Sequence, residues 1–220
     1  MKNADVTGTE DLGWHGSWRF TRERAVEPEL TLLFHDLYET AFGPLRTRAM
    51  ARQVLTAEEF GQQMADADVL KYVAWTADGD PVGMATLTNE LSTVPWISPE
   101  YFAARYPEQW ARGAVWYFGF VLTHPDQRHS RFLDELIRVG VDALVAQEAI
   151  CGYDMCAYNV DELGLTRQAA ETLQRAAGTQ PNQADTQNYY AVDFGKRVQA
   201  PPSTSSSSVG PSSTDGPGTL

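Results

Sequence analysis

The residues best suited to chemistry lie in one short loop, between an apolar run and an amphipathic helix. Arg128, His129, Ser130 and Arg131 bring basic side chains and a hydroxyl to the point where the helix begins. A helix N-terminus attracts anions through its free N–H groups. Phosphate cradles of this kind usually contain glycine, and this loop has none. The loop therefore predicts phosphate binding by side chains, although the same residues also fit a structural turn with solvated charges.

The segments on either side of this loop predict a β-α-β unit. Residues 114–123 are almost all apolar, which is typical of a central strand covered on both faces. Residues 132–146 carry apolar pairs every four positions, as in a helix packed on a sheet. Residues 151–158 predict the next strand, so the unit should form a right-handed crossover.

Further elements alternate along the chain in a pattern that indicates one α/β (α+β) domain. We expect a mixed central sheet of about six or seven strands with helices on both faces. The supporting signals are a helix from Pro28 to Gly43, a capping box at Thr56 and Glu59, a hairpin around Asp78–Gly79, a helix over 163–177 and a last strand at 188–194.

Composition divides the chain into three parts. Residues 1–27 are polar and predict a loose N-terminal arm, and residues 28–196 predict the folded α/β domain. Within that domain, residues 91–113 form an insertion rich in aromatic side chains. Residues 197–220 are rich in Ser, Pro and Gly and predict a disordered tail, because such a segment cannot bury enough apolar surface to fold.

The net charge and the cysteine and histidine positions exclude several classes of partner and cofactor. The 220 residues include 17 basic and 29 acidic side chains, a net charge of −12, so we expect neither a nucleic-acid nor a membrane partner. There is no apolar leader or run of membrane-spanning length, and a cytoplasmic protein is expected. Cys151 and Cys156 are too far apart on a strand to bridge, and the four histidines have no metal-ligand spacing, so no metal is expected.

The stretch "FVLTHPDQRHSRFLDELI", together with the hairpin before it, resembles the GNAT superfamily of acyl-CoA-dependent acyltransferases. Members of that family read V-x-P-x-x-R-G-x-G-x-G at this junction. His124–Pro125–Asp126 and Arg128 match the motif, while His129, Arg131 and Leu133 occupy its three glycine positions. Farther on, Asn159 matches a second family signature, but Gln174 stands where the family has a tyrosine and Thr179 where it has a phenylalanine.

The resemblance implies an acyl donor, acetyl-CoA or another acyl-CoA, held along the strand and the loop. An acyl carrier protein is the alternative donor, because pantetheine would fit between splayed strands whatever the loop binds. The residues that the resemblance assigns to the donor are Phe120, Val121, Leu122, Thr123, Arg128, His129, Ser130, Arg131 and Phe132.

Acyl transfer needs a base for the acceptor and an acid for the leaving sulfur. Glu90 follows the third expected strand and is a candidate base, or alternatively a solvated hairpin end. Tyr117 has a hydroxyl within an apolar run and is either catalytic or an ordinary core tyrosine. Tyr158 ends the expected fifth strand, where it could replace the missing acid.

The acceptor is expected near two other features. Arg46, Arg48 and Arg52 concentrate positive charge in an acidic chain and would suit a carboxylate or phosphate, unless they pair with the chain's own acids. Trp96 and Tyr101, in the aromatic insertion, predict a lid, an apolar pocket wall or a partner surface, or alternatively a cluster that covers the sheet.

These features together predict an acyltransferase acting on a small amine or hydroxyl acceptor, as a monomer or a homodimer. The alternative is a GNAT-like domain without this activity, which binds a small ligand or a partner, or the same fold turned to another reaction.

Overall fold

The computed structural model describes residues 8–127 and 131–195 of the chain. The chain divides into two compact units, Met1–Ala184 and Asp185–Leu220. The strands are β1 (Glu10–His15), β2 (Trp18–Glu23), β3 (Leu70–Trp75), β4 (Pro81–Thr88), β5 (Val115–Thr123) and β6 (Ile150–Gly152). The α-helices are α1 (Pro28–Phe42), α2 (Ala57–Ala65), α3 (Pro99–Arg105), α4 (Pro107–Ala111), α5 (Phe132–Ala146) and α6 (Leu165–Ala177). Short 3₁₀ turns lie at Gly43–Thr47, Leu91–Thr93 and Pro125–Gln127, and a π-helical turn at Tyr158–Glu162.

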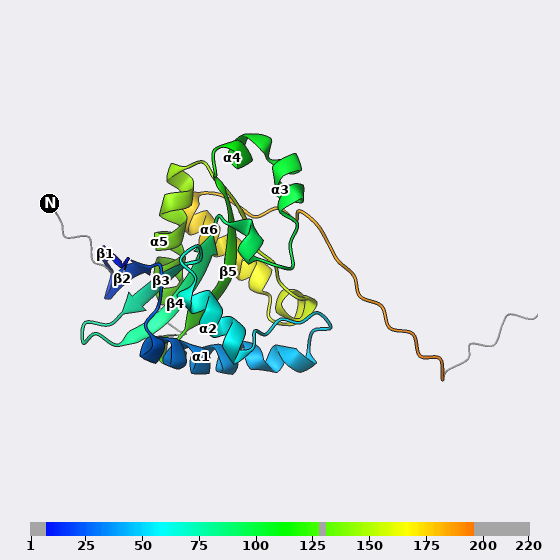
Figure 1. The fold of residues 1–220 in the computed structure, drawn as a ribbon, viewed down its shortest axis with the longest axis horizontal. Helices are drawn as coiled ribbons and strands as arrows, with labels where there is room; N and C mark the ends of the chain where they lie inside the picture. The colour runs from blue at the N-terminus through cyan, green and yellow to red at the C-terminus, as the bar shows by residue number, and fades with distance from the viewer. Residues whose placement is uncertain (1–7, 128–130, 196–220) are drawn as a thin grey trace, which may run out of the picture. The chain divides into compact units, whose positions relative to one another are not determined.

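The six strands form one mixed sheet in the order β1-β2-β3-β4-β5-β6 (Figure 1). The first five pair antiparallel with their neighbours, and β6 pairs parallel with β5 after the crossover through α5. This confirms the fold class predicted from the sequence, including helices on both faces. The order also makes β4 the most buried strand and leaves β5 next to the edge. As expected, β5 pairs with a strand on each side and its side chains pack into clusters on both faces, although it lies next to the edge strand β6.

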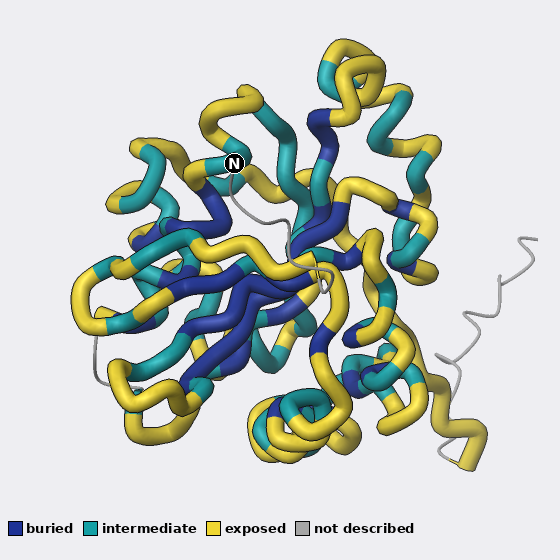
Figure 2. Tube along the Cα trace, turned by 60° about the vertical axis from the view of Figure 1, so that its left-hand side comes forward, coloured by how far each residue is buried: buried dark blue, intermediate teal, exposed yellow. Residues whose placement is uncertain are grey.

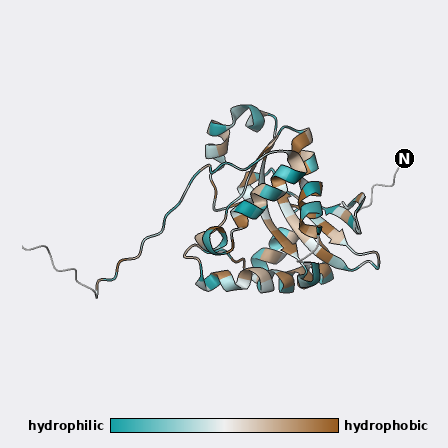
Figure 3. Cartoon of the chain, turned by 180° about the vertical axis from the view of Figure 1, so that it is seen from behind, coloured by the Kyte–Doolittle hydropathy of each residue, from teal (hydrophilic) through white to brown (hydrophobic). Residues whose placement is uncertain are grey.

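Apolar side chains from the two faces of the sheet form separate clusters. On one face, α1 and α2 contribute Phe34, Tyr38, Phe60 and Met64, which pack with residues of β3, β4 and β5. On the other face, α5 packs on β2, β3 and β4, and α6 packs on α5. Figure 2 shows the buried chain running through the sheet, and Figure 3 shows apolar strands between helices with polar outer faces.

Local signals in the sequence set several element boundaries. The capping box of Thr56 and Glu59 opens α2, and Ser98 caps α3 ahead of Pro99. Gly178, at φ +66°, ends α6 in the left-handed conformation that glycine tolerates. The start of α2 and the end of α6 confirm the predicted boundaries, whereas α6 begins at Leu165, two residues later than expected.

Three expectations about strands were wrong. Residues 10–23, assigned to a loose arm, form β1 and β2, and β2 pairs with β3 over five residue pairs. The strand expected at 151–158 ends at Gly152, and a π-helical turn follows. A last strand was expected at residues 188–194. These residues form neither a helix nor a strand, because no described segment pairs with them. The tail at 197–220 lies outside the described residues.

The second unit is described only over residues 185–195. Four of its large apolar side chains are exposed: Tyr189, Tyr190, Val192 and Phe194. In the part of the chain that the structure describes, none of the helices combines the length and apolar character needed to cross a bilayer.

Candidate functional site

The candidate site lies where β5 loses its neighbour in the sheet. Strand β6 pairs with β5 only at Val115, Trp116 and Tyr117, although β5 continues to Thr123. On its other side, β5 stays paired with β4 as far as Thr123, opposite Gly83. Among the described residues, no strand therefore pairs with the β6-facing edge of β5 beyond Tyr117.

Hydrogen-bond geometry shows which backbone groups face that edge. The N–H of His124 donates to the carbonyl of Val82 at 2.8 Å, so this residue points its backbone toward β4. Backbone groups alternate in direction along a strand. Val121 and Thr123 consequently direct their N–H and C=O groups away from β4, toward the side from which β6 has departed.

A β-bulge distorts β5 just before this edge. Between the paired positions Ala85–Val121 and Leu87–Phe118, one residue of β4, Thr86, lies opposite two residues of β5, Gly119 and Phe120. The displaced N–H of Phe120 donates to Thr86 Oγ1 at 3.1 Å. A Cβ at Gly119 would lie 2.4 Å from the same Thr86 oxygen, so the bulge requires glycine there. Bulges are over-represented next to active sites, where they redirect side chains.

An exposed carboxylate, Asp154, stands two residues beyond the end of β6. The hydroxyl of Tyr117 donates to Asp154 Oδ1, and the indole Nε1 of Trp96 donates to the same oxygen at 3.1 Å. Burial, followed by the bond to Asp154, raises the pKa of Tyr117 far above its usual value, so the phenol stays protonated and remains a donor. Two donors thus fix the carboxylate of Asp154, which is exposed to solvent.

Glycine at the end of β6 allows this arrangement. A Cβ at Gly152 would lie 2.9 Å from Phe102 and 3.1 Å from the ring of Tyr117. The ring of Phe102, from α3 in the insertion, packs with the buried cluster that contains Tyr117. The insertion is therefore part of the site's wall: it supplies Trp96 directly and covers the end of β6 with Phe102.

Arg48 and Tyr158 come together on the α1 and α2 face. Nη1 of Arg48 donates to the Tyr158 hydroxyl at 2.5 Å, and the guanidinium carbon lies 4.5 Å from the ring centroid. Tyr158 and Cys156 both pack against the cluster that contains Phe120. Among the described residues, Arg48 forms no ion pair with a carboxylate.

The other two arginines of the predicted acceptor group are engaged within the chain. Arg46 binds both oxygens of Glu39 at 2.6 Å, and Arg52 binds both oxygens of Glu59 at 2.5 and 2.8 Å. Residues 48–52 are not helical, so Arg48 and Arg52 do not share a helical face. Arg46 and Arg52 thus pair with acidic side chains of the chain itself, which was the alternative to acceptor binding. Arg48 does not form such a pair among the described residues.

Glu90 and Tyr101 make local contacts. Glu90 caps the 3₁₀ turn Leu91–Thr93, where its carboxylate accepts from the Ser92 hydroxyl at 2.7 Å. The Tyr101 hydroxyl donates to the carbonyl of Ala184 at 3.2 Å, and its side chain is 38% exposed. Glu90 thus stabilises the turn that follows β4. Tyr101 links the insertion to Ala184, the last residue of the first unit.

The residues predicted to bind the donor separate into several groups. Phe120, Leu122 and Phe132 have buried side chains, so only their backbone could contact a ligand. A Cβ at Gly83 would lie 2.4 Å from Phe132, which shows how closely α5 approaches β4. Arg131 is exposed at the start of α5. The remaining loop residues, Arg128, His129 and Ser130, lie outside the described residues.

Neither cysteine has an observed partner that would activate it. Both are free thiols, and burial raises the pKa of Cys151 to about 12, which keeps it protonated. In the described ranges 8–127 and 131–195, no group of three or more His, Cys, Asp or Glu side chains is arranged to hold a metal ion.

Sequence reasoning missed Asp154. Its donors, Tyr117 and Trp96, are 37 and 58 residues away along the chain, so no local motif marks it. The one available signal was an acidic residue within four positions of the expected strand start, in a segment otherwise short of charge.

Comparisons with known proteins gave structural neighbours only. No family model matches the chain, and no curated protein matches it. An aminoglycoside acetyltransferase from an uncultured soil metagenomic sample, in complex with sisomicin, is similar over 80% of this chain and 97% of its own, at 11% identity and a TM-score of 0.45. A ribosomal-protein-alanine N-acetyltransferase from Brucella melitensis biovar Abortus 2308 is similar over 81% of this chain and 99% of its own, at 15% identity and a TM-score of 0.44.

A third neighbour, an aminoglycoside 6'-N-acetyltransferase from Acinetobacter baumannii, covers 81% of this chain and 99% of its own, at 14% identity and a TM-score of 0.40. At these identities, and with TM-scores below 0.5, the neighbours carry no argument about this chain. The assignment of the fold rests instead on the strand order and on the parallel pair of β5 and β6.

Proposed function

We propose that this protein transfers an acyl group from a pantetheine thioester to a small amine. The observation that carries the proposal is the fixed, solvent-accessible carboxylate of Asp154 beside the point where β5 loses its strand partner. An open strand edge binds extended ligands through backbone hydrogen bonds. Pantetheine is extended and contains amide groups, so Val121 and Thr123 are suited to hold it.

Asp154 is suited to act as the general base. A carboxylate held by two donors can, without moving, take the proton that the acceptor nitrogen loses as the amine attacks the thioester carbonyl. In this proposal Tyr117 and Trp96 are positioning residues, because their hydrogen bonds fix the carboxylate. The half-exposed indole of Trp96 and the neighbouring aromatic side chains favour a cationic acceptor with an apolar body.

Tyr158 is suited to protonate the leaving sulfur. Its oxygen accepts a hydrogen bond from Arg48, so its own phenolic hydrogen stays available for donation. The ring packs against the cluster that includes Phe120, on the strand that would hold the donor. Tyr158 was a candidate from the sequence, and its contact with Arg48 supports keeping it in this role.

The acyl donor is proposed to be CoA or a pantetheine-bearing carrier protein. The described part of the loop contributes Arg131, whose guanidinium would suit a phosphate. If the loop binds the pyrophosphate, acetyl-CoA should be used more efficiently than acetyl-pantetheine. If it does not, the two donors should have similar kcat/KM values.

The test measures thiol release from acetyl-CoA and acetyl-pantetheine with a panel of primary amines. Asp154→Asn should lower kcat about 100-fold or more while leaving the KM for the donor nearly unchanged. Asp161→Asn, an exposed acid in the π-helical turn, serves as the matched control and should keep full activity. Absence of turnover with every amine, together with no CoA binding by calorimetry, would refute acyl transfer and favour the binding-module alternative.

A further inference from the structure

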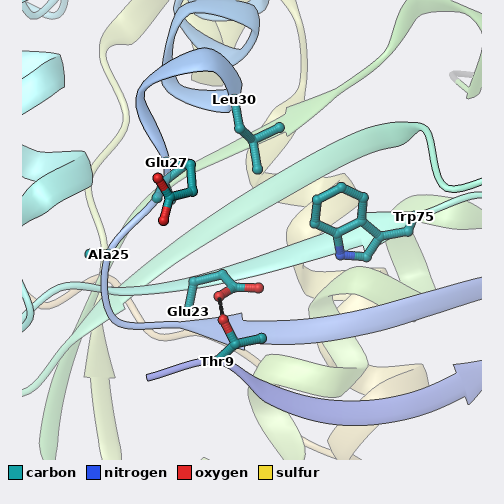
Figure 4. A pocket seen from close by; sticks show the side chains of 7 residues that line it. Thr9, Glu23, Ala25, Glu27, Leu30 and Trp75 are labelled. Atoms are coloured by element: carbon teal, nitrogen blue, oxygen red, sulfur yellow. Dashed lines mark hydrogen bonds between the residues drawn. The ribbon is translucent and has the colours of Figure 1, made fainter. Parts of the chain in front are cut away.

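A small cavity lies away from the proposed reaction site, between the end of β2 and the start of α1. It has a volume of about 180 Å³ and is lined by Thr9, Glu23, Ala25, Val26, Glu27, Leu30 and Trp75. Figure 4 shows the carboxylates of Glu23 and Glu27 turned toward the same space, with the side chains of Leu30 and Trp75 beside it. None of the residues proposed for acyl transfer lines this cavity.

Glu23 is a buried acid without a basic partner. Its exposed fraction is only 7%, and its carboxylate accepts a hydrogen bond from the Thr9 hydroxyl. Among the described residues, no Lys, Arg or His nitrogen lies within ion-pair distance of it. A buried carboxylate of this kind is costly unless a cation or further donors compensate it.

The nearest basic residue in register is committed elsewhere. Lys71 lies opposite Glu23 in the β2–β3 pair. Its Nζ donates to the carbonyl oxygens of Asp66 at 2.6 Å and Arg24 at 3.0 Å. The ammonium group of Lys71 therefore binds backbone oxygens and not the carboxylate of Glu23.

The apolar residues that line the cavity indicate which kind of cation it can bind. Val26 and Leu30 are aliphatic, and the indole Nε1 of Trp75 is occupied by Thr21 Oγ1 at 2.8 Å. The ring of Trp75 is thus left as an apolar and weakly cation-attracting surface. A metal ion would prefer a cage of oxygens, whereas two carboxylates against an apolar wall suit an ammonium group with an alkyl chain.

We infer that this cavity, formed by Glu23, Glu27, Leu30 and Trp75, is a second binding site that takes a small primary alkylammonium compound. The ammonium group hydrogen-bonds to the two carboxylates, and the alkyl chain packs on Leu30 and Trp75. Primary rather than quaternary ammonium is selected, because only the former donates hydrogen bonds to carboxylates. The site is independent of the proposed acyl transfer, and its ligand need not be the acceptor.

The test follows the indole N–H signal of Trp75 by two-dimensional NMR, assigned with a Trp75→Phe variant. Butylammonium chloride should shift this signal saturably at millimolar concentration, and potassium chloride at equal ionic strength should not. Glu23→Gln should weaken butylammonium binding at least tenfold. Glu29→Gln, an exposed acid in the first turn of α1 that does not line the cavity, should leave binding unchanged.

Several outcomes would overturn the inference. Binding that is equal in the wild type and in Glu23→Gln would remove the carboxylate from the site. Tighter binding of tetramethylammonium than of butylammonium would contradict the primary-amine class, and tighter binding of Nα-acetyl-lysine methylamide would point to a lysine side chain of a partner. If circular dichroism shows that Glu23→Gln does not fold, the substitution of the exposed Glu27, Glu27→Gln, replaces it in the test. Glu27→Gln should weaken butylammonium binding at least threefold. Unchanged binding in that variant would refute the site.

Discussion

Lys71 offers a quantitative test of the core, because it is a fully buried lysine whose ammonium group contacts only carbonyl oxygens. Its side chain has no exposed surface, and its Nζ binds the backbone of Arg24 and of Asp66 at the end of α2. Burial lowers the pKa of Lys71 from 10.5 to about 8, while the nearby charge of Asp66 opposes this shift. A lowered lysine pKa means that the folded protein binds this proton less tightly than the unfolded chain does.

The sign of the pH dependence follows from this difference. Below pH 8 the folded state must hold a charged, poorly solvated ammonium group, so the full cost is present; the cost shrinks as the pH rises from about 8 to 10.5. We expect Lys71 ionisation to lower the free energy of unfolding by about 3 kcal/mol at pH 7 and by about 1 kcal/mol at pH 10. Stability should therefore gain about 2 kcal/mol from this residue over that range.

Urea unfolding of the wild type and of Lys71→Met at pH 7 and pH 10 measures the effect. The variant removes a donor from the carbonyl oxygens of Arg24 and Asp66, although the Asp66 oxygen still accepts from the Val69 N–H. This loss costs about 1–3 kcal/mol independently of pH. Other titrating groups act on both proteins and cancel in the comparison. The wild type should therefore gain about 2 kcal/mol relative to Lys71→Met between pH 7 and pH 10.

A constant difference between the two proteins would refute this reasoning. A relative change below about 0.5 kcal/mol would mean that the ammonium group remains hydrated in the folded state, with a pKa close to its ordinary value. A relative change in the opposite direction would mean that an acidic partner stabilises the charged form.

Two further predictions address the packing of α5 and the proposed acid. Gly83→Ala should lower the free energy of unfolding by about 3 kcal/mol or more in urea titrations. The added Cβ would lie 2.4 Å from the Phe132 ring and 2.7 Å from the backbone oxygen of Leu122. A loss below about 1 kcal/mol would show that α5 can shift to make room for the methyl group. Arg48→Met and Tyr158→Phe should each lower kcat about tenfold. The double variant should lose little more than either single one, since the two side chains act through one hydrogen bond; additive losses in steady-state assays would contradict that coupling.

Elements marked by local chemistry could be predicted from the sequence. The capping box before α2, the Ser98–Pro99 start of α3 and the glycine that ends α6 each satisfy free backbone groups with neighbouring residues. The spacing of apolar pairs in α5 was equally informative, because Phe132 and Leu136 both face the sheet. Such signals need only a few consecutive residues and do not depend on the rest of the fold.

The first two strands were missed because charged side chains interrupt their apolar pattern. Across the hairpin, Arg19 binds Asp11 and Arg22 binds Glu10, so charges stand where an alternating apolar pattern would have indicated a strand. The apparent last strand at 188–194 failed for the converse reason. Its composition favours a strand, but a strand also needs a neighbour, and composition does not supply one.

The candidate site could be predicted only in part. Tyr117, Tyr158 and Arg48 were candidates from their residue types, whereas Asp154 becomes meaningful only once the fold brings Trp96 and Tyr117 to it. Charge counting likewise could not separate Arg48 from its neighbours. The distinction depends on which carboxylates lie within reach, and only the structure supplies that.

The position of the site follows from backbone N–H and C=O groups of β5 that have no strand partner among the described residues. Strand β6 is three residues long and β5 is nine, so part of β5 lacks a neighbour. N–H and C=O groups without a partner are unfavourable unless water or a ligand satisfies them. In the proposed function, an extended ligand with amide groups binds this edge, and Asp154, two residues past the end of β6, acts as the base. The shortness of β6, more than any single side chain, therefore explains why the binding edge and the candidate base occur together.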